Sequence, residues 1–165
     1  MFLKVLMLKQ DDPRKCSAAK LVKFGLAKPV TRTASRTLIL NPFSKKILLK
    51  SDKKFVNSIT GIDCSWNLVT SAFKKPFTGI SRKLPPLLAG NPMNYSKLNK
   101  LSTVEALAGA VYILGEPDLT HNLLQKFKWG NTFFELNKNL LQDYSKAQSE
   151  AEILEICHEY RLANA

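Results

Sequence analysis

The sequence is poor in the features that mark several large classes of protein. Its three cysteines, Cys16, Cys64 and Cys157, are odd in number and widely spaced. We therefore expect neither a disulfide framework nor a zinc site, and we expect a reducing compartment, the cytoplasm. No apolar run approaches the roughly 18 residues that a membrane span needs, and the run at 2–8 is broken by Lys4. We expect no signal peptide and no membrane anchor.

The common catalytic signatures are also missing. The 165 residues contain no G-x-G-x-x-G, no Walker loop, no H-E-x-x-H and no G-x-S-x-G. Dinucleotide, phosphate-loop, zinc-protease and hydrolase sites of the standard kinds are thereby excluded. His121 and His158 lie in helical patterns without a cysteine or second histidine at ligand spacing. We expect packing or surface roles for both, and no bound metal.

Acidic residues are scarce in the first hundred positions. Residues 1–100 hold 20 Lys and Arg against 4 Asp and Glu, whereas residues 101–165 hold 5 against 9. The net charge of +12 therefore belongs to the first three-fifths of the chain. Such a field attracts phosphate backbones, so we expect nucleic acid to bind there. The alternative is a lysine-rich face that is only solvated.

Short apolar runs alternate with helical patterns in the first part. Strands are predicted at 2–8, 37–40, 58–64 and 84–90, with a further extended piece at 47–49. A helix is predicted over 17–24 with Ser17 as its N-cap. This alternation favours an α/β fold with a mostly parallel sheet. In such sheets ligands collect outside the carboxyl ends of the strands. There we expect the loops at 11–17, 41–44, 63–67 and 90–95 to meet.

The pattern changes after residue 101. Ser102 and Glu105 match a capping box, which predicts a helix that runs to Leu114. Three more helices are predicted at 119–127, 132–144 and 147–161. We therefore expect a basic α/β domain over 1–92 and an all-helical domain over 93–165 packed on it.

Several segments carry a resemblance to a known family. They read DDPRKCS at 11–17, LNPFSKK at 40–46, GIDCSWN at 61–67, RKLPPLLAGNPMNYSKLNKLSTVEALAGAVYILG at 82–115 and FKWGNTFFELNKNLLQDY at 127–144. In this order and spacing they resemble the ribosomal RNA aminocarboxypropyltransferases, and the short chain is typical of archaeal members. The resemblance implies a SPOUT-like knotted fold, which the residues alone would not predict because knots are rare.

The resemblance also implies an activity. It is the transfer of the 3-amino-3-carboxypropyl group of S-adenosylmethionine to N3 of an N1-methylpseudouridine in 16S or 18S type rRNA, with release of methylthioadenosine and without a metal. The implied partner is small-subunit rRNA or a preribosomal particle. We expect a monomer, because the helical part covers the surface through which knotted methyltransferases dimerise.

The resemblance places the cofactor among six residues: Ser17, Ile62, Trp66, Leu84, Asn99 and Thr103. Trp66 would shield the methyl group and contact the cationic sulfur, a contact worth about 0.5 to 2 kcal/mol. The alternative is a core tryptophan. Ser17 and Thr103, each at a helix start, would bind the carboxylate of the transferred arm. The Ile62 carbonyl would accept from the ribose, and the backbone of Leu84 and Asn99 would contact the adenine.

Asp63 is one of the 4 acids before residue 101 and ends a predicted strand. It is a candidate catalytic residue that could draw the proton from N3 or stabilise the sulfonium. Capping of the following helix is an equal alternative.

Phosphate contacts, which position RNA without reading its sequence, are expected from basic residues of the first part. The candidates are Arg32, Arg36, Lys45, Lys46, Lys74, Lys75, Arg82 and Lys83. The target base would be flipped out or lie in a single-stranded loop. Two other functions stay open: a SPOUT-type RNA methyltransferase and a noncatalytic RNA-binding assembly factor.

Overall fold

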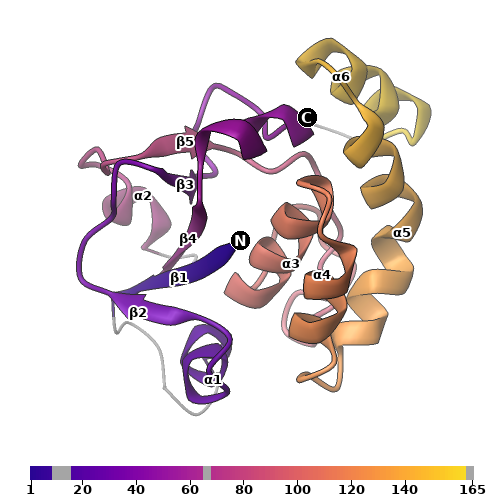
Figure 1. Ribbon diagram of the computed structural model, residues 1–165. Helices are drawn as coiled ribbons and strands as arrows, with labels where there is room; N and C mark the ends of the chain where they lie inside the picture. Colours follow the sequence, from indigo (N-terminus) through magenta and orange to yellow (C-terminus); the bar gives the residue numbers. More distant parts are fainter. Residues whose placement is uncertain (9–15, 65–67, 163–165) are drawn as a thin grey trace.

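A five-stranded parallel sheet lies on one side of this computed structural model, which describes residues 1–8, 16–64 and 68–162 (Figure 1). The strands are β1 (Phe2–Met7), β2 (Lys28–Val30), β3 (Thr37–Leu40), β4 (Ser58–Asp63) and β5 (Ile80–Arg82). Their order across the sheet is β2-β1-β4-β3-β5. All four neighbouring pairs are parallel, so the carboxyl ends of the strands lie along one edge. The predicted parallel sheet is confirmed.

The central strand β4 is the strand of the sheet against which the helical part packs. It pairs with β1 from Ser58 to Asp63 and with β3 on its other side. Its buried Thr60 hydroxyl lies 2.7 Å from that of Thr37, so each satisfies the other. Gly61 has no side chain, and a Cβ there would lie 3.1 Å from the Thr103 methyl group. This glycine lets a helix approach β4 closely.

The helices divide into two groups. Three short ones accompany the strands: α1 (Ser17–Lys23), the 3-10 helix η1 (Lys50–Phe55) and α2 (Val69–Ala72). Four follow the sheet: α3 (Thr103–Ile113), α4 (Pro117–Leu124), α5 (Gly130–Lys146) and α6 (Glu150–Glu159). Figure 1 shows α3 next to the sheet, α4 beside α3, and α5 and α6 farther from the sheet. The predicted helical C-terminal part is confirmed, and no described helix is long and apolar enough to span a bilayer.

The capping box at the start of α3 is confirmed, whereas the predicted cap of α1 is wrong. The Ser102 hydroxyl accepts from Glu105 N, and the Glu105 carboxylate accepts from Ser102 N. At α1 the cap is Cys16, whose sulfur accepts from Ala19 N over 3.4 Å, and Ser17 is the first helical residue.

The predicted strand at 84–90 is also wrong, because its backbone finds partners in side chains of α5. Pro85 and Pro86 have no N–H to donate to a ladder. The Asn137 amide donates to the Leu88 carbonyl and accepts from Leu88 N, each over 2.8 Å. The Tyr144 hydroxyl donates to the Pro86 carbonyl over 2.9 Å. The segment between β5 and α3 is therefore a long loop fastened to α5. The division into domains at residue 92 falls within this loop and stays a prediction.

Candidate functional site

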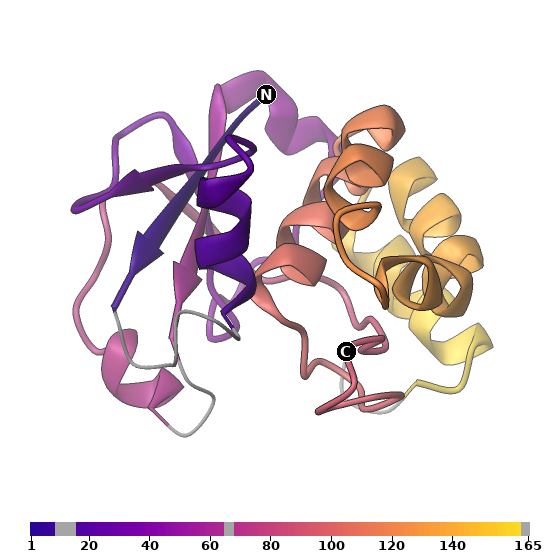
Figure 2. The ribbon, with the colours of Figure 1, turned by 90° about the horizontal axis from the view of Figure 1, so that it is seen from below.

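A cavity of about 1130 Å³ opens at the carboxyl ends of the strands. Figure 2 shows β1 and β4 ending on the side where α2 and the segment before α3 lie. The four loops that were expected to meet all contribute to it, through Cys16–Ser17, Asn41–Pro42, Asp63–Cys64 and residues 91–94. The prediction that these loops meet is confirmed for their described residues.

Asp63 joins three elements at the floor of this cavity. Its Oδ1 accepts a hydrogen bond from the Thr103 hydroxyl over 2.9 Å, and its Oδ2 accepts from the Cys16 thiol over 3.0 Å. The carboxylate at the end of β4 thus fastens the start of α1 and the start of α3. The N-cap of the following helix, α2, is Leu68, without a side-chain capping bond. The alternative role for Asp63 as the cap of that helix is therefore wrong.

Cys16 is a buried thiol, and the sequence predicted for it neither a disulfide nor a zinc site. Burial raises its pKa from 9.0 to about 11, and the hydrogen bond with Asp63 adds to the rise. The thiol is therefore protonated at neutral pH and can donate to the carboxylate. Its place directly before Ser17, at a helix start, was the only local signal of this role.

Ser17 and Thr103 lie together, as the resemblance implied. Both line the cavity, and the Ser17 hydroxyl accepts from Val104 N, in the first turn of α3, over 3.3 Å. An accepting hydroxyl still has a proton to donate. The Thr103 proton is already donated to Asp63, which leaves its oxygen as an acceptor.

Glu105 is a fully buried carboxylate that holds the loop at 90–91, which contributes Asn91 to the cavity lining. Its Oε1 accepts from Gly90 N over 2.6 Å and from Asn91 N over 2.9 Å. Its Oε2 accepts from the Asn91 side chain over 2.8 Å and from Ser102 N over 2.7 Å. The sequence showed only the capping half of this network, because the other half depends on contacts across 14 and 15 residues.

Three of the other four residues expected at the cofactor line the cavity, and the fourth lies outside the described residues. Ile62, Leu84 and Asn99 all line the cavity. Asn99 has a φ of 60°, a conformation that asparagine tolerates, and its N–H donates to the Leu87 carbonyl over 2.9 Å. Trp66 lies outside the described residues.

Seven of the eight basic candidates present their side chains to solvent or to the cavity. Six are exposed: Arg32, Arg36, Lys45, Lys46, Lys74 and Lys75. Lys83 is half-buried and lines the cavity. Arg82 differs, because its side chain is only 18% exposed and its guanidinium lies 2.9 Å from the buried Asp52 carboxylate. The charge of Arg82 is therefore already engaged within the protein.

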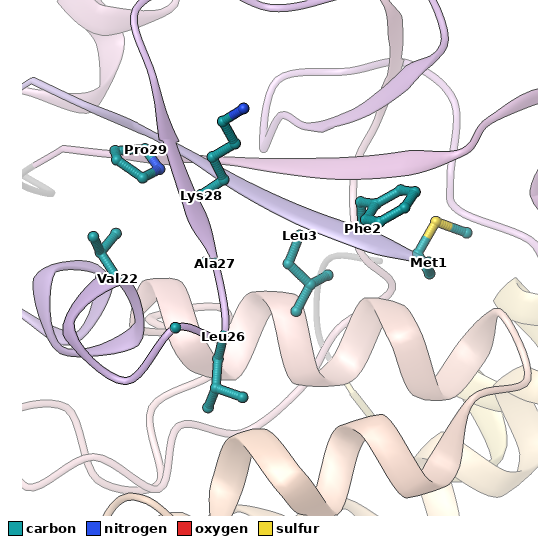
Figure 3. A pocket seen from close by; sticks show the side chains of 9 residues that line it. Met1, Phe2, Leu3, Val22, Leu26, Ala27, Lys28 and Pro29 are labelled. Carbon is teal, nitrogen blue, oxygen red and sulfur yellow. The ribbon is translucent and has the colours of Figure 1, made fainter.

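A second hollow, of about 420 Å³, lies at the amino end of β1 (Figure 3). Its lining runs from Met1 to Leu3 and from Gly25 to Pro29, with Val22 of α1. Lys28 is the one charged side chain in this lining. The hollow lies at the opposite end of β1 from Asp63, so it is separate from the candidate site.

Two protein families match the sequence. Residues 38–161 match the family described as "Ribosome biogenesis protein, C-terminal". Residues 4–35 match one described as "Possible Fer4-like domain in RNase L inhibitor, RLI". That range holds a single cysteine, Cys16, whereas an iron–sulfur cluster needs four ligands. The second match therefore brings no cluster site.

Curated relatives and a solved structure agree with the first match. The 16S rRNA aminocarboxypropyltransferase of Methanococcoides burtonii is 40% identical over 163 residues, which cover 96% of this chain and 94% of the relative. That of Sulfurisphaera tokodaii is 44% identical over 149 residues, which cover 89% and 87%. The SAM-dependent rRNA:acp-transferase Tsr3 from Vulcanisaeta distributa matches with a TM-score of 0.86 and 34% identity over 98% of this chain and 89% of that one. The chain thus belongs to the family of 16S rRNA aminocarboxypropyltransferases.

Proposed function

We propose that this protein transfers the 3-amino-3-carboxypropyl group of S-adenosylmethionine to small-subunit rRNA. The observation that carries the proposal is the cavity of about 1130 Å³ at the carboxyl ends of the strands, in a chain of this family. Cofactor-sized ligands occupy pockets of roughly 300 to 1,000 Å³, often at such strand ends. The cavity has room for this cofactor.

The start of α3 suits the carboxylate of the transferred arm. This helix has 11 residues, and the N–H groups of its first turn favour an anion. We assign the carboxylate to the hydroxyls of Ser17 and Thr103, which line the cavity beside that turn. The Thr103 hydroxyl would turn from Asp63 to make this contact.

We assign the remaining cofactor contacts as the family resemblance places them. The Ile62 carbonyl takes the ribose hydroxyls, and the backbone of Leu84 and Asn99 takes the adenine edge. These three residues line one cavity, which supports the assignment. Trp66, outside the described residues, is assigned to the methyl group and the sulfonium.

The transfer requires one bond to form and one to break. N3 of the target base bonds to the first methylene of the arm, and the bond from that methylene to sulfur breaks. The electron pair stays on sulfur, which leaves as neutral methylthioadenosine. The N3 proton passes to Asp63 or to water. We propose N1-methylpseudouridine as the target base, because its N3 keeps a proton that can be lost.

Separate labels on the cofactor test the proposal. The protein is incubated with rRNA and S-adenosylmethionine labelled either in the methyl group or in the arm carboxylate. Only the arm label should reach the RNA, and methylthioadenosine should be released. Methyl label on the RNA would identify a methyltransferase instead. No binding of S-adenosylmethionine in calorimetry would leave a noncatalytic assembly factor.

We also propose the finer features that the resemblance implies: the SPOUT-like knot, a monomer and a cytoplasmic location. The strand order supports a knot, because β4 lies between the earlier strands β1 and β3. The packing of α3 against β4 supports a monomer, because this helix covers one face of the sheet (Figure 1). The described cysteines, Cys16, Cys64 and Cys157, form no disulfide with one another, as suits a reducing compartment. Light scattering over a range of concentrations tests the monomer, and an experimental chain trace tests the knot.

A further inference from the structure

Three phenylalanine rings form a row beside the cavity mouth. The Phe43 and Phe73 ring centroids lie 5.9 Å apart with the planes at 65°, and those of Phe73 and Phe77 lie 5.6 Å apart at 77°. These edge-to-face contacts stabilise the three rings as one unit. The members come from two separate loops, one after β3 and one after α2.

The row leads from the cavity to solvent. Phe73 lines the cavity, together with Asn41 and Pro42, which precede Phe43 in the chain. Phe43 itself is 53% exposed. A large apolar ring therefore stands in water at the edge of the cavity in which the transfer would occur.

Hydrogen bonds hold the Phe43 loop in place. Asn41 N donates to the Arg82 carbonyl over 2.8 Å, and Phe43 N donates to the Asn41 side chain over 2.9 Å. The Ser44 hydroxyl donates to the Ser81 carbonyl over 3.1 Å. The ring is therefore presented by a loop that is hydrogen-bonded to β5, which lowers the conformational entropy that this loop would lose on binding a ligand.

The surroundings of the row are uniformly basic in sequence. Neither 40–51 nor 64–104 contains an aspartate or a glutamate. The four exposed lysines nearest in the chain to Phe43 and Phe73 are Lys45, Lys46, Lys74 and Lys75. Positive charge next to an exposed aromatic face complements a polymer that carries both phosphates and flat bases.

We propose that Phe43 is a stacking platform for an unpaired rRNA base adjacent to the target nucleotide. The proposal rests on the proposed function, because it takes rRNA as the substrate. Lysines at 45, 46, 74 and 75 would contact the phosphates on either side. A base stacked on Phe43 would place its neighbour over the Phe73 wall of the cavity. Stacking on an aromatic ring is the usual way in which proteins hold unpaired RNA bases.

Four variants test the platform. Phe43→Ala and Phe43→Leu remove the π face, and Phe43→Trp enlarges it. Phe55→Ala is the matched control, because Phe55 is 58% exposed but ends η1, ahead of the amino end of β4. Binding of an rRNA fragment that contains the target loop is measured by fluorescence anisotropy. Binding of S-adenosylmethionine is measured by calorimetry.

The expected result is selective for RNA. The Kd for the fragment should rise on the order of 5- to 150-fold in Phe43→Ala and Phe43→Leu. It should stay equal or fall in Phe43→Trp, and stay within about twofold in Phe55→Ala. Cofactor affinity should be unchanged in all four. If Phe43→Ala unfolds, Phe43→Leu carries the test, because leucine still packs on Phe73.

Salt dependence separates stacking from charge. The slope of log K against log salt should be unchanged in Phe43→Ala, because a phenyl ring neutralises no phosphate. In Lys45→Gln and Lys74→Gln it should become shallower by roughly 0.7 for each phosphate that the lysine neutralised. A flattened slope in Phe43→Ala would mean that the ring only positions lysines, and would overturn the platform.

RNA binding by Phe43→Ala and arm transfer by the wild-type protein test the platform and the proposed function separately. Wild-type RNA affinity in Phe43→Ala, with normal arm transfer by the wild-type protein, overturns the platform alone. Absence of arm transfer by the wild-type protein overturns the function on which the platform rests.

Discussion

The Thr103 hydroxyl donates a hydrogen bond to the Asp63 carboxylate over 2.9 Å, between residues 40 positions apart in the sequence. It joins the first residue of α3 to the last residue of β4. The same threonine packs its methyl group against Gly61, where a Cβ would lie 3.1 Å away. One side chain therefore sets both the distance and the orientation of helix and strand at the cavity floor.

Replacing Thr103 by valine keeps its shape and removes the donor. We expect the free energy of unfolding to fall by about 1 to 2 kcal/mol, because Asp63 loses one of the two side-chain donors that the described part of the chain supplies. Affinity for S-adenosylmethionine should fall as well. Urea denaturation and calorimetry measure the two effects. Thr103→Ser, which keeps the hydroxyl, should stay near the wild type. A loss in Thr103→Ser without one in Thr103→Val would show that the methyl group, not the hydrogen bond, matters.

Because the pKa of the Cys16 thiol is raised, we expect the free energy of unfolding to depend on pH. Its pKa is raised in the folded protein from 9.0 to about 11. The folded state binds this proton more tightly than the unfolded state does. The thiol's contribution to the free energy of unfolding is therefore full below pH 9 and is lost as the pH rises through 11. We expect the unfolding free energy of the wild type to fall over this range by about 1 to 2 kcal/mol more than that of Cys16→Ser.

Serine is the informative replacement, because its hydroxyl can still donate to Asp63 and does not titrate. Chemical denaturation at several pH values makes the measurement. Parallel curves for the wild type and Cys16→Ser would contradict the assignment.

Glu105→Gln should be among the most damaging conservative changes. The carboxylate accepts four hydrogen bonds from Gly90, Asn91 and Ser102. An amide would turn its N–H₂ toward two of those donors. We expect a loss of about 2 to 4 kcal/mol in unfolding free energy and weaker cofactor binding. The control is Glu135→Gln, which removes an exposed pair with Lys138 and should cost about 0.5 kcal/mol or less.

Trp66→Ala should weaken binding of the charged cofactor more than binding of its neutral product. A tryptophan over the sulfonium would be worth about 0.5 to 2 kcal/mol, so affinity for S-adenosylmethionine should fall by roughly 2- to 30-fold. Affinity for methylthioadenosine, whose sulfur is uncharged, should change less. Trp66→Phe should show an intermediate effect. Equal losses for both ligands in calorimetry would remove the sulfonium contact from the proposal.

The parts of the fold that depend on local sequence were predictable. β1, β3 and β4 are short segments rich in apolar and β-branched residues, and the start of α3 is a capping box within four residues. β2 was not predicted, because Lys28–Val30 is a three-residue edge strand with an exposed proline. The segment at 84–90 was wrongly predicted as a strand. It has the apolar run of one, but its backbone bonds to the side chains of Asn137 and Tyr144 and to the backbone of Lys97 and Asn99, later in the same loop.

In the site, too, features set by local sequence were predictable, and contacts between distant residues were not. The meeting of four loops was predictable from the strand ends alone. The hydrogen bond from Cys16 to Asp63 spans 47 residues, and no pattern in the sequence reports it. The engagement of Arg82 with Asp52 spans 30 residues and was likewise missed.

The strand order has a consequence for how the chain is made. All four residues of β3 are buried, yet both of its partners, β4 and β5, come later in the sequence. A nascent chain that has not yet reached Ser58 therefore carries an apolar strand with no neighbour to pair with. Pairings that wait for distant residues form slowly and expose apolar surface in the meantime. For this protein the vulnerable moment comes during synthesis, before the middle of the sheet exists.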